Sequence, residues 1–428
     1  MRMLILGAGP AGLGAAWRLR ELGRKDFLVL EAEDRVGGLS SSVVDSKGFL
    51  WDMGGHVEYS HYEYFDAALA KAMPAKAWLE HDREAWVWAF GRFIPYPFQY
   101  NIRHLPPSVL RACLRTLPRK VRTDSPSFEE WALSSFGSGI ARAFMLPYNR
   151  KLWSYPLSRL GSSWVAGRVA AMDPSRVRRN VRSGEDDRAW GGNRTFRYPR
   201  TGGTGAVWDA VADRIGRDRI RLRSRVVSVD AMTKRVRLAN GRWLGYDVLI
   251  NTSPLDVFAQ RVRGLSEGAK RAAARLRHNS IHIVGLGLRG APPELVAPKF
   301  WIYFPEKRYA FYRVEILSNF SPNNVPTRSP HWSVLVEMSG AFKDPVRGLI
   351  RAGIIRSKKD IVDRWHRRIR HGYPLPTLDR DGLLARVQPE LEKLDIHSIG
   401  RFGAWRYEEG NQDHCFMQGV GKIDELGG

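Results

Sequence analysis

The chain has 428 residues, 43% of them hydrophobic, which is more than one core usually needs, so we expect more than one domain. No apolar stretch approaches the roughly 20 residues of a membrane span, and only two cysteines occur, so we expect no span, no disulfide framework, no metal site and a cytoplasmic location. The net charge is +24, yet no recognition motif suggests a nucleic-acid partner. A solvated arginine-rich surface is the simplest reading, and composition leaves open whether the charge also steers a polyanionic small substrate.

The chain begins with an apolar strand that runs into a glycine turn. Gly7, Gly9 and Gly12 have the spacing Gly-x-Gly-x-x-Gly between a predicted strand and a predicted helix, the context in which this motif binds a dinucleotide. The first glycine permits the turn, the second admits a pyrophosphate, and the third lets helix and strand pack closely. Glu31 ends the next strand, roughly twenty residues on, where a ribose-binding carboxylate is expected. The motif alone does not separate FAD from NAD.

The glycines that follow favour FAD. Gly38 and Ser40 come just after the acidic strand, and a second close backbone approach there suits a longer cofactor. A further turn, Gly54 and Gly55, precedes His56. Such a histidine suits the edge of an isoalloxazine ring, although a histidine in this setting is more often only structural.

The remaining patterns, in chain order, predict an α/β fold. Residues 85–90 and 91–99 predict a β-hairpin with its turn at Gly91, and residues 107–169 have helical spacing with a helix cap at Ser125 or Ser127. Strands and helices then alternate, one strand ending at Asn251, before strands dominate from 280 to 339. We expect a discontinuous Rossmann-type FAD-binding domain (1–80, 190–278 and 385–428), a helical-bundle substrate domain (101–189) and an antiparallel β-sheet domain (81–100 and 279–384).

Motifs spread over nearly the whole chain resemble those of the UDP-galactopyranose mutase family, specifically its eukaryotic-type branch. They include residues 95–99, 147–153, 301–306, 371–374 and 401–407. The resemblance implies a flavoenzyme, an isomerase, that interconverts the pyranose and furanose forms of a nucleoside-diphosphate hexose, most simply UDP-galactose. In this family N5 of reduced FAD attacks the anomeric carbon, with no net redox change. The resemblance also implies NAD(P)H as external reductant.

The resemblance further implies roles for individual residues. A diphosphate leaving group needs fixed cationic and hydroxyl donors. The expected catalytic residues are Arg168 and Arg313, as the diphosphate clamp, and His56, hydrogen-bonding near the flavin rather than acting as a general base. The expected substrate contacts are Tyr96, Phe98, Gln99, Asn149, Trp153, Asn193, Trp301, Tyr303, Tyr373 and Tyr407, the first five lying at or near the base. The expected cofactor contacts are Gly7, Gly9, Gly12, Glu31, Gly38, Ser40, Val226, Arg401, Asn411 and Gln412.

Several positions depart from the family pattern. Phe320 stands where the family has a diphosphate-contacting Tyr, Glu58 and Tyr59 replace an apolar pair ending in Phe, and Tyr100 replaces an Asn near the base. These changes leave the chemistry intact but leave open whether the substrate is a GDP- or dTDP-hexose instead. A short run, 323–331, replaces an insert that some relatives use in assembly, so we expect a monomer or dimer.

Two other functions are open to the same architecture. An oxidase of the amine-oxidase type would need an apolar substrate cavity, and the arginine and tyrosine set argues against it. A non-enzymatic binder similar to the GDP-dissociation inhibitors would not use flavin, and the intact Gly9, Gly12 and Glu31 argue against that.

Overall fold

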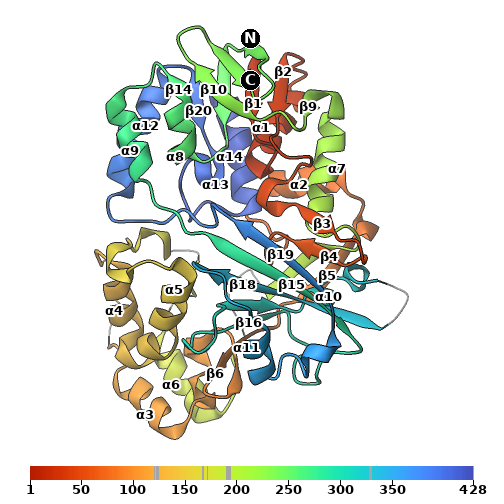
Figure 1. Ribbon diagram of the computed structural model, residues 1–428. Helices are drawn as coiled ribbons and strands as arrows, with labels where there is room; N and C mark the ends of the chain where they lie inside the picture. Colours follow the sequence, from red (N-terminus) through yellow and green to blue (C-terminus); the bar gives the residue numbers. More distant parts are fainter. Residues whose placement is uncertain are drawn as a thin grey trace.

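The computed structural model describes residues 1–119, 121, 125–165, 168–170, 172–188, 194–326 and 330–427 (Figure 1). A five-stranded sheet in the upper half of Figure 1 has the strand order β20-β13-β1-β2-β9, and every pair in it is parallel. Its strands come from three separate parts of the chain, as the sequence predicts. They are β1 (Met3–Leu6), β2 (Phe27–Leu30), β9 (Ile220–Arg221), β13 (Val248–Asn251) and β20 (Ile396–Ser398).

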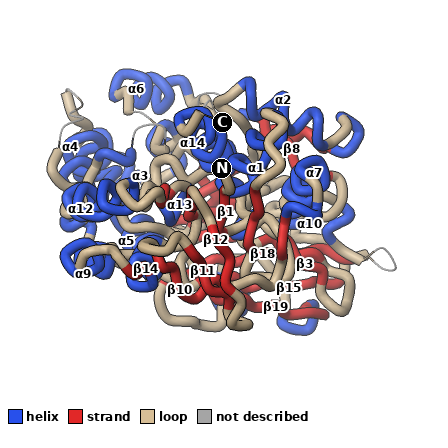
Figure 2. The backbone as a smooth tube through the Cα atoms, turned by 90° about the horizontal axis from the view of Figure 1, so that it is seen from above, coloured by secondary structure: helices blue, strands red, loops and turns tan. Residues whose placement is uncertain are grey.

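Successive side chains along each strand point to opposite faces of the sheet, and helices cover both faces. In β1, Met3 and Ile5 join one buried cluster with α1 (Pro10–Glu21), α2 (Glu63–Ala72), α7 (Gly205–Ile215) and α14 (Gln412–Glu425). Leu4 and Leu6 join another cluster with α8 (Leu255–Phe258), α9 (Glu267–Arg275) and α12 (Arg380–Glu392). The amino end of the chain therefore packs directly on its carboxyl end, and Figures 1 and 2 both show the two termini close together.

A seven-stranded sheet, order β19-β15-β18-β17-β16-β6-β7, lies below the parallel one in Figure 1. Its pairs are antiparallel except β16 with β6, which is parallel. Gly285 and Gly287 in β15 make room for two rings, since a Cβ on either would lie within 2.5 Å of Trp51 or Phe49. The strands are β6 (Ala85–Ala89), β7 (Arg92–Pro95), β15 (Ile281–Arg289), β16 (Trp301–Tyr303), β17 (Arg313–Glu315), β18 (His331–Ser339) and β19 (Ile361–Ile369).

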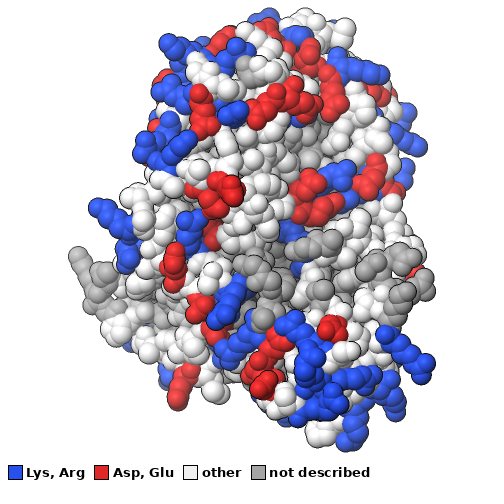
Figure 3. Space-filling view, turned by 180° about the vertical axis from the view of Figure 1, so that it is seen from behind, with Lys and Arg blue, Asp and Glu red and all other residues white. Residues whose placement is uncertain are grey.

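The helical insert lies at the lower left of Figure 1. Ser127 caps its second helix by accepting a hydrogen bond from the Glu130 amide. Its helices are α3 (Pro107–Arg115), α4 (Phe128–Ile140), α5 (Leu146–Trp153) and α6 (Pro174–Ser183). Lys and Arg side chains gather at the lower right of the rear surface (Figure 3). The exposed arginines of the insert include Arg111, Arg115, Arg178, Arg179 and Arg182.

Smaller elements complete the fold. A four-stranded sheet contains β10 (Val226–Asp230), β11 (Arg235–Leu238), β12 (Trp243–Gly245) and β14 (Val262–Arg263). Two strand pairs join β3 (Ser42–Val44) to β4 (Leu50–Asp52) and β5 (Trp78–Asp82) to β8 (Thr195–Pro199). Three short helices are α10 (Leu317–Phe320), α11 (Val346–Arg351) and α13 (Gly400–Gly403).

The predicted fold class is confirmed. The predicted hairpin forms between β6 and β7, and the strand ending at Asn251 returns to the parallel sheet beside β1. The predicted domain boundaries stay a prediction, and β5 runs across the one at residue 80. Of the helices in the described part of the chain, none is long and apolar enough to cross a bilayer.

Candidate active site

A cavity of about 860 Å³ lies between the glycine turn after β1, the N-terminus of α14 and the strands β16 and β17. Its described wall contains ten arginines but only four carboxylates, those of Glu31, Glu33, Glu58 and Asp413, so it suits an anionic ligand. Eighteen of the residues predicted from the sequence line it. They are Gly7, Gly9, Glu31, Gly38, Ser40, His56, Tyr96, Asn149, Arg168, Val226, Trp301, Tyr303, Arg313, Tyr373, Arg401, Tyr407, Asn411 and Gln412.

One end of the cavity has the features of a dinucleotide site. Helix α1 starts after Gly9 and α14 after Asn411, and neither helix has a side-chain cap, so their first amides are available to an anionic or carbonyl oxygen. Gly12 does not line the cavity. Its role is close packing, because a Cβ there would lie 1.9 Å from the Gly7 carbonyl oxygen. The buried Glu31 carboxylate accepts hydrogen bonds from the Ala8 and Glu33 amides, at 2.7 and 2.8 Å, which hold it in place at the wall.

His56 is held in the turn that follows β4. Burial, reinforced by the positive charge of Arg401, lowers its pKa to about 4, so the imidazole is neutral near pH 7. Its Nδ1 has no hydrogen-bond partner within the described part of the chain. The preceding Gly55 is required by packing, since a Cβ there would lie 2.6 Å from Oε1 of Glu315. Nδ1 of His56 is therefore available for one hydrogen bond to a bound group. The low pKa makes His56 a poor general base.

Arg168 reaches the cavity from the helical insert and is held by the C-terminal segment. Its Nη2 donates to the backbone carbonyls of Tyr407 and Glu408, at 3.0 and 2.7 Å, and Nη1 donates to the Asn411 side chain. The guanidinium also lies 5.2 Å from the Tyr407 ring centroid. These partners are neutral, so the contacts fix the group without cancelling its charge.

Arg313 reaches the cavity from β17 and is paired with two buried carboxyl groups. Its Nη2 donates to both oxygens of Glu337, at 2.7 and 2.8 Å, and its Nε lies 2.6 Å from Oε1 of Glu315. Burial and the negative charge of Glu337 raise the pKa of Glu315 well above its ordinary value. Although burial opposes it, the neighbouring Arg313 lowers the pKa of Glu337. The two shifts therefore favour ionisation of Glu337 and protonation of Glu315.

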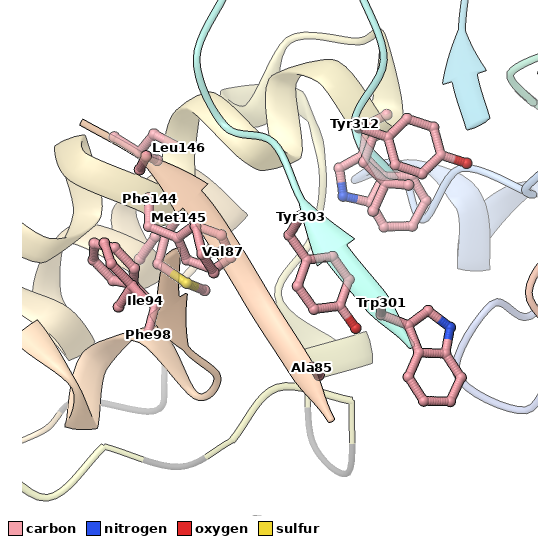
Figure 4. Packing of buried hydrophobic residues seen from close by; sticks show 14 of the residues in the cluster. Ala85, Val87, Ile94, Phe98, Phe144, Met145, Leu146, Trp301, Tyr303 and Tyr312 are labelled. Atoms are coloured by element: carbon pink, nitrogen blue, oxygen red, sulfur yellow. The ribbon is translucent and has the colours of Figure 1, made fainter. Parts of the chain in front are cut away.

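Aromatic side chains line the same cavity as the two arginines. Trp301 and Tyr303 lie on one face of β16 and point the same way in Figure 4. Tyr303 lies 5.2 Å from Tyr96, and Tyr373 lies 5.5 Å from Tyr407, measured between ring centroids. Burial raises the pKa of Tyr373 to about 12, so its phenol is protonated and able to donate a hydrogen bond.

The comparisons with known proteins agree with this geometry. Residues 10–394 match the model of the flavin-containing amine oxidoreductase family. A crystal structure of reduced UDP-galactopyranose mutase is 41% identical, with a TM-score of 0.95, covering 99% of this chain and 93% of that one. The chain belongs to the UDP-galactopyranose mutase family. Two oxidases share only the fold: a putative protoporphyrinogen oxidase from Exiguobacterium sp. 255-15 (15% identity, TM-score 0.74, covering 99% and 98%) and cyclohexylamine oxidase from Brevibacterium oxydans IH-35A (16%, 0.66, 100% and 99%).

Membership of this mutase family makes the protein a flavoenzyme and an isomerase, with FAD as its cofactor. The residues present fit that cofactor. The turn packed at Gly12 and the uncapped N-terminus of α1 would receive the pyrophosphate, the held carboxylate of Glu31 would accept from a ribose hydroxyl, and the uncapped N-terminus of α14 would offer a second dipole end.

Three predicted substrate contacts of this mutase-family chain lie behind the cavity wall. Phe98 is fully buried, stacks on Phe144 and lies in Figure 4 among aliphatic side chains, away from Tyr303. Gln99 donates to the Ala170 carbonyl oxygen at 3.0 Å, and Trp153 donates from its indole to Asn149 at 3.1 Å. A fourth predicted contact, Asn193, lies outside the described residues. In this structure Phe98, Gln99 and Trp153 support the wall and do not form it.

Two of the departures from the mutase pattern also lie behind the wall. Phe320 is fully buried with its ring centroid 5.0 Å from that of Trp301. The Tyr100 hydroxyl accepts from the Asp173 amide at 3.1 Å, joining this segment to α6. A third departure, Tyr59, is on the wall, where its hydroxyl accepts from the Asn411 amide group at 2.8 Å.

Five further residues lie at or beside the cavity and were not predicted from the sequence to contact a ligand. Arg83 lies over Trp301, 4.9 Å from the ring centroid, and Tyr148 lies 5.5 Å from Tyr303. Tyr148 occurs within the predicted motif 147–153, so that signal was available. Tyr59 and Glu337 make their contacts with residues far away in the sequence, Asn411 and Arg313, whereas Glu315 is only two residues from Arg313 on the same strand.

Proposed function

We propose that the chain is a reduced-FAD-dependent mutase that interconverts the pyranose and furanose forms of a nucleoside-diphosphate hexose, UDP-galactose being the best candidate. The observation that carries this proposal is that Arg168 and Arg313 line the same cavity as Tyr303, Tyr373 and Tyr407. The name of the 41% identical relative, UDP-galactopyranose mutase, supports the choice of sugar nucleotide. When bound and reduced, the flavin supplies a nucleophile for the anomeric carbon.

The role of the protein is to stabilise the diphosphate as it leaves and to hold it until it returns. Arg168 carries a charge that no carboxylate in direct contact cancels in the described structure, so it attracts the diphosphate strongly. Arg313 is oriented by Glu337 and keeps part of its donor set for the ligand. The protonated hydroxyl of Tyr373 adds a neutral donor. Fixed donors of this kind need no rearrangement at the moment of bond cleavage.

The polar wall distinguishes this function from oxidation of an apolar amine. Ten arginines on the described wall would make it costly to bury a cationic amine there. The oxidases that share the fold are 15–16% identical, which supports a common architecture and not a common substrate.

Fewer residues of the cavity lining are available to select the nucleotide base than to bind the diphosphate. Tyr96 and Asn149 are on the wall near the predicted base end. The Asn149 side chain already donates to the Met145 carbonyl and accepts from the Trp153 indole, so only part of its hydrogen-bonding capacity is free. A GDP- or dTDP-hexose is therefore the alternative substrate.

Two accessory properties belong to the same proposal. NAD(P)H is the external reductant; an anaerobic mixture in which NADPH and NADH both leave the flavin oxidised would contradict this. The protein is a monomer or dimer; light scattering that gives the mass of a tetramer would contradict that.

A chromatographic assay tests the proposed function. The dithionite-reduced protein and an oxidised control are each incubated with UDP-galactopyranose, a GDP-hexose and a dTDP-hexose. We expect a new isomer in the reduced sample only, fastest with UDP-galactopyranose. Oxygen uptake without any isomer would support the oxidase reading, and a colourless protein would support the non-enzymatic binder.

A further inference from the structure

Two histidines and an aspartate converge where the parallel-sheet part of the molecule meets the seven-stranded sheet. Asp256 lies in α8, His278 lies between α9 and β15, and His371 follows β19. Their side chains are only 13–22% exposed. One ligand atom from each lies within 4.8 Å of the others. The residues are 22 and 93 positions apart in the sequence, so no metal-binding motif marks them.

The hydrogen bond of His278 fixes which of its nitrogens can bind a ligand. Its Nδ1 lies 3.1 Å from the Asn279 carbonyl oxygen, which can only accept, so Nδ1 carries the proton. In the neutral imidazole Nε2 then presents a lone pair, and it lies 3.7 Å from Oδ2 of Asp256. A lone pair facing a carboxylate oxygen is unfavourable unless a cation lies between them. Histidines that bind metals usually donate their other ring N–H to a carbonyl in this way.

The distances agree with a tetrahedral cation site. Ligands about 2.0–2.1 Å from zinc are separated from one another by about 3.3 Å. Nε2 of His371 lies within hydrogen-bonding distance of both Asp256 oxygens, at 3.1 and 3.0 Å, an interaction that a bound cation would replace. Oδ2 of Asp256 lies 3.7 Å from Nε2 of His278, so the two values for Oδ2 fall on either side of the tetrahedral separation. The two imidazole rings are tilted by 32° with centroids 4.0 Å apart, so both can turn toward a common point. Two imidazoles and a carboxylate are ligands that zinc and similar transition metals prefer.

The surroundings favour a structural ion with one exception. Phe402 and Trp405 pack edge-on against His371, with centroids 5.4 and 6.3 Å away, and shield one side from water. The positive charge of Arg370 opposes cation binding, because it lies close enough to His278 to disfavour a second positive charge there. A second cluster, His61, Asp413 and His414, has similar ligands, but the side chain of His61 is 48% exposed and two of the three residues are neighbours in the chain.

We propose that Asp256, His278 and His371 bind one zinc-class divalent cation, with a water molecule as the fourth ligand. The ion joins the two parts of the molecule beside the substrate wall. Two residues beyond His371, the Tyr373 amide donates to Oδ1 of the Asn279 side chain at 2.8 Å, and the Tyr373 carbonyl oxygen accepts from the Asn279 amide at 3.1 Å, so the same junction holds the backbone of Tyr373. The proposal does not depend on the proposed function, because it concerns this junction alone.

Zinc titration of the FAD-loaded, chelator-treated protein by isothermal calorimetry tests the proposal. We expect one zinc ion per chain and a rise in the thermal unfolding temperature. Asp256→Asn and His278→Phe should each weaken binding by more than about 100-fold, because loss of a ligand exceeds the roughly 10–100-fold loss seen for outer partners. His61→Phe, in the second cluster, is the matched control and should bind zinc as the wild type does.

An anomalous-scattering map of zinc-soaked wild-type crystals gives an answer even if a variant fails to fold. A peak between the three side chains supports the proposal. Absence of stoichiometric zinc binding, or loss of binding in His61→Phe with retention in His278→Phe, overturns it.

Discussion

The two arginines of the proposed diphosphate clamp are held in opposite ways. Arg168 comes from the helical insert, and neutral carbonyl and amide oxygens of the C-terminal segment fix it. Arg313 comes from the seven-stranded sheet, and two buried carboxyl groups, those of Glu315 and Glu337, fix it. The difference indicates that Arg168 supplies most of the uncompensated charge, whereas Arg313 supplies a rigid direction for hydrogen bonding.

The largest expected effect concerns the carboxyl pair behind Arg313. Removing both carboxyl groups with Glu315→Gln/Glu337→Gln leaves a buried cation unpaired, and we expect a loss of about 3–5 kcal/mol in the free energy of unfolding. Each single variant should cost far less, because the remaining carboxyl group can ionise beside Arg313. Denaturant titration of the four proteins in a double-mutant cycle measures this. Additive losses would show that the two groups do not share one charge.

The next effect separates the two arginines in catalysis. Arg168→Ala and Arg313→Ala should each lower kcat by about 10²–10³-fold, as removal of a fixed transition-state donor does, while the bound flavin spectrum stays unchanged. Arg168→Lys, which keeps the charge, should recover more activity than Arg313→Lys, which loses the two-oxygen contact with Glu337. Loss of flavin from either alanine variant would show that the clamp is misplaced.

A smaller effect tests a buried acid on the cavity wall. Burial, with the negative charge of Asp413 second, raises the pKa of Glu58 from 4.5 to about 8. As the pH rises, Glu58 loses its proton in the unfolded chain before it does so in the folded protein. The contribution of this proton to stability is therefore fully present below pH 4.5 and is lost as the pH rises to about 8. Between pH 6 and pH 7 the wild type should lose about 1.4 kcal/mol of unfolding free energy relative to Glu58→Gln. An equal pH dependence in both proteins would place the proton elsewhere.

The smallest effect concerns the family tyrosine that this chain lacks. Because Phe320 lies behind Trp301, Phe320→Tyr should change kcat/KM by less than about 0.5 kcal/mol, below the roughly 1 kcal/mol of a new hydrogen bond. Steady-state kinetics with the best nucleotide sugar measure it. A tenfold gain would show that the hydroxyl reaches the diphosphate.

The features that the sequence predicted best depend on nearby residues. The glycine turn, the hairpin at Gly91 and the cap at Ser127 each follow from a few consecutive side chains. The prediction for Arg168 and Arg313 came from the family resemblance, and both residues line the same cavity, while their roles stay a prediction. What holds them could not be read from the sequence, because Glu337 is 24 residues from Arg313 and Asn411 is 243 residues from Arg168.

At the predicted base end, a sequence motif predicted ligand contacts that the structure does not show. Phe98 and Gln99 belong to a motif that predicts ligand contact, yet packing against Phe144 and a bond to the Ala170 carbonyl turn both side chains into the wall. A short motif cannot show this, since the partners belong to the helical insert.

The central claim is that isomerisation at the arginine clamp consumes no electrons. The protein is reduced once, anaerobically and without excess reductant, and mixed with a large excess of UDP-galactopyranose while product and flavin absorbance are followed. The account predicts many molecules of product for each flavin, with the flavin still reduced at the end. At most one product per flavin, accompanied by flavin reoxidation, would contradict it.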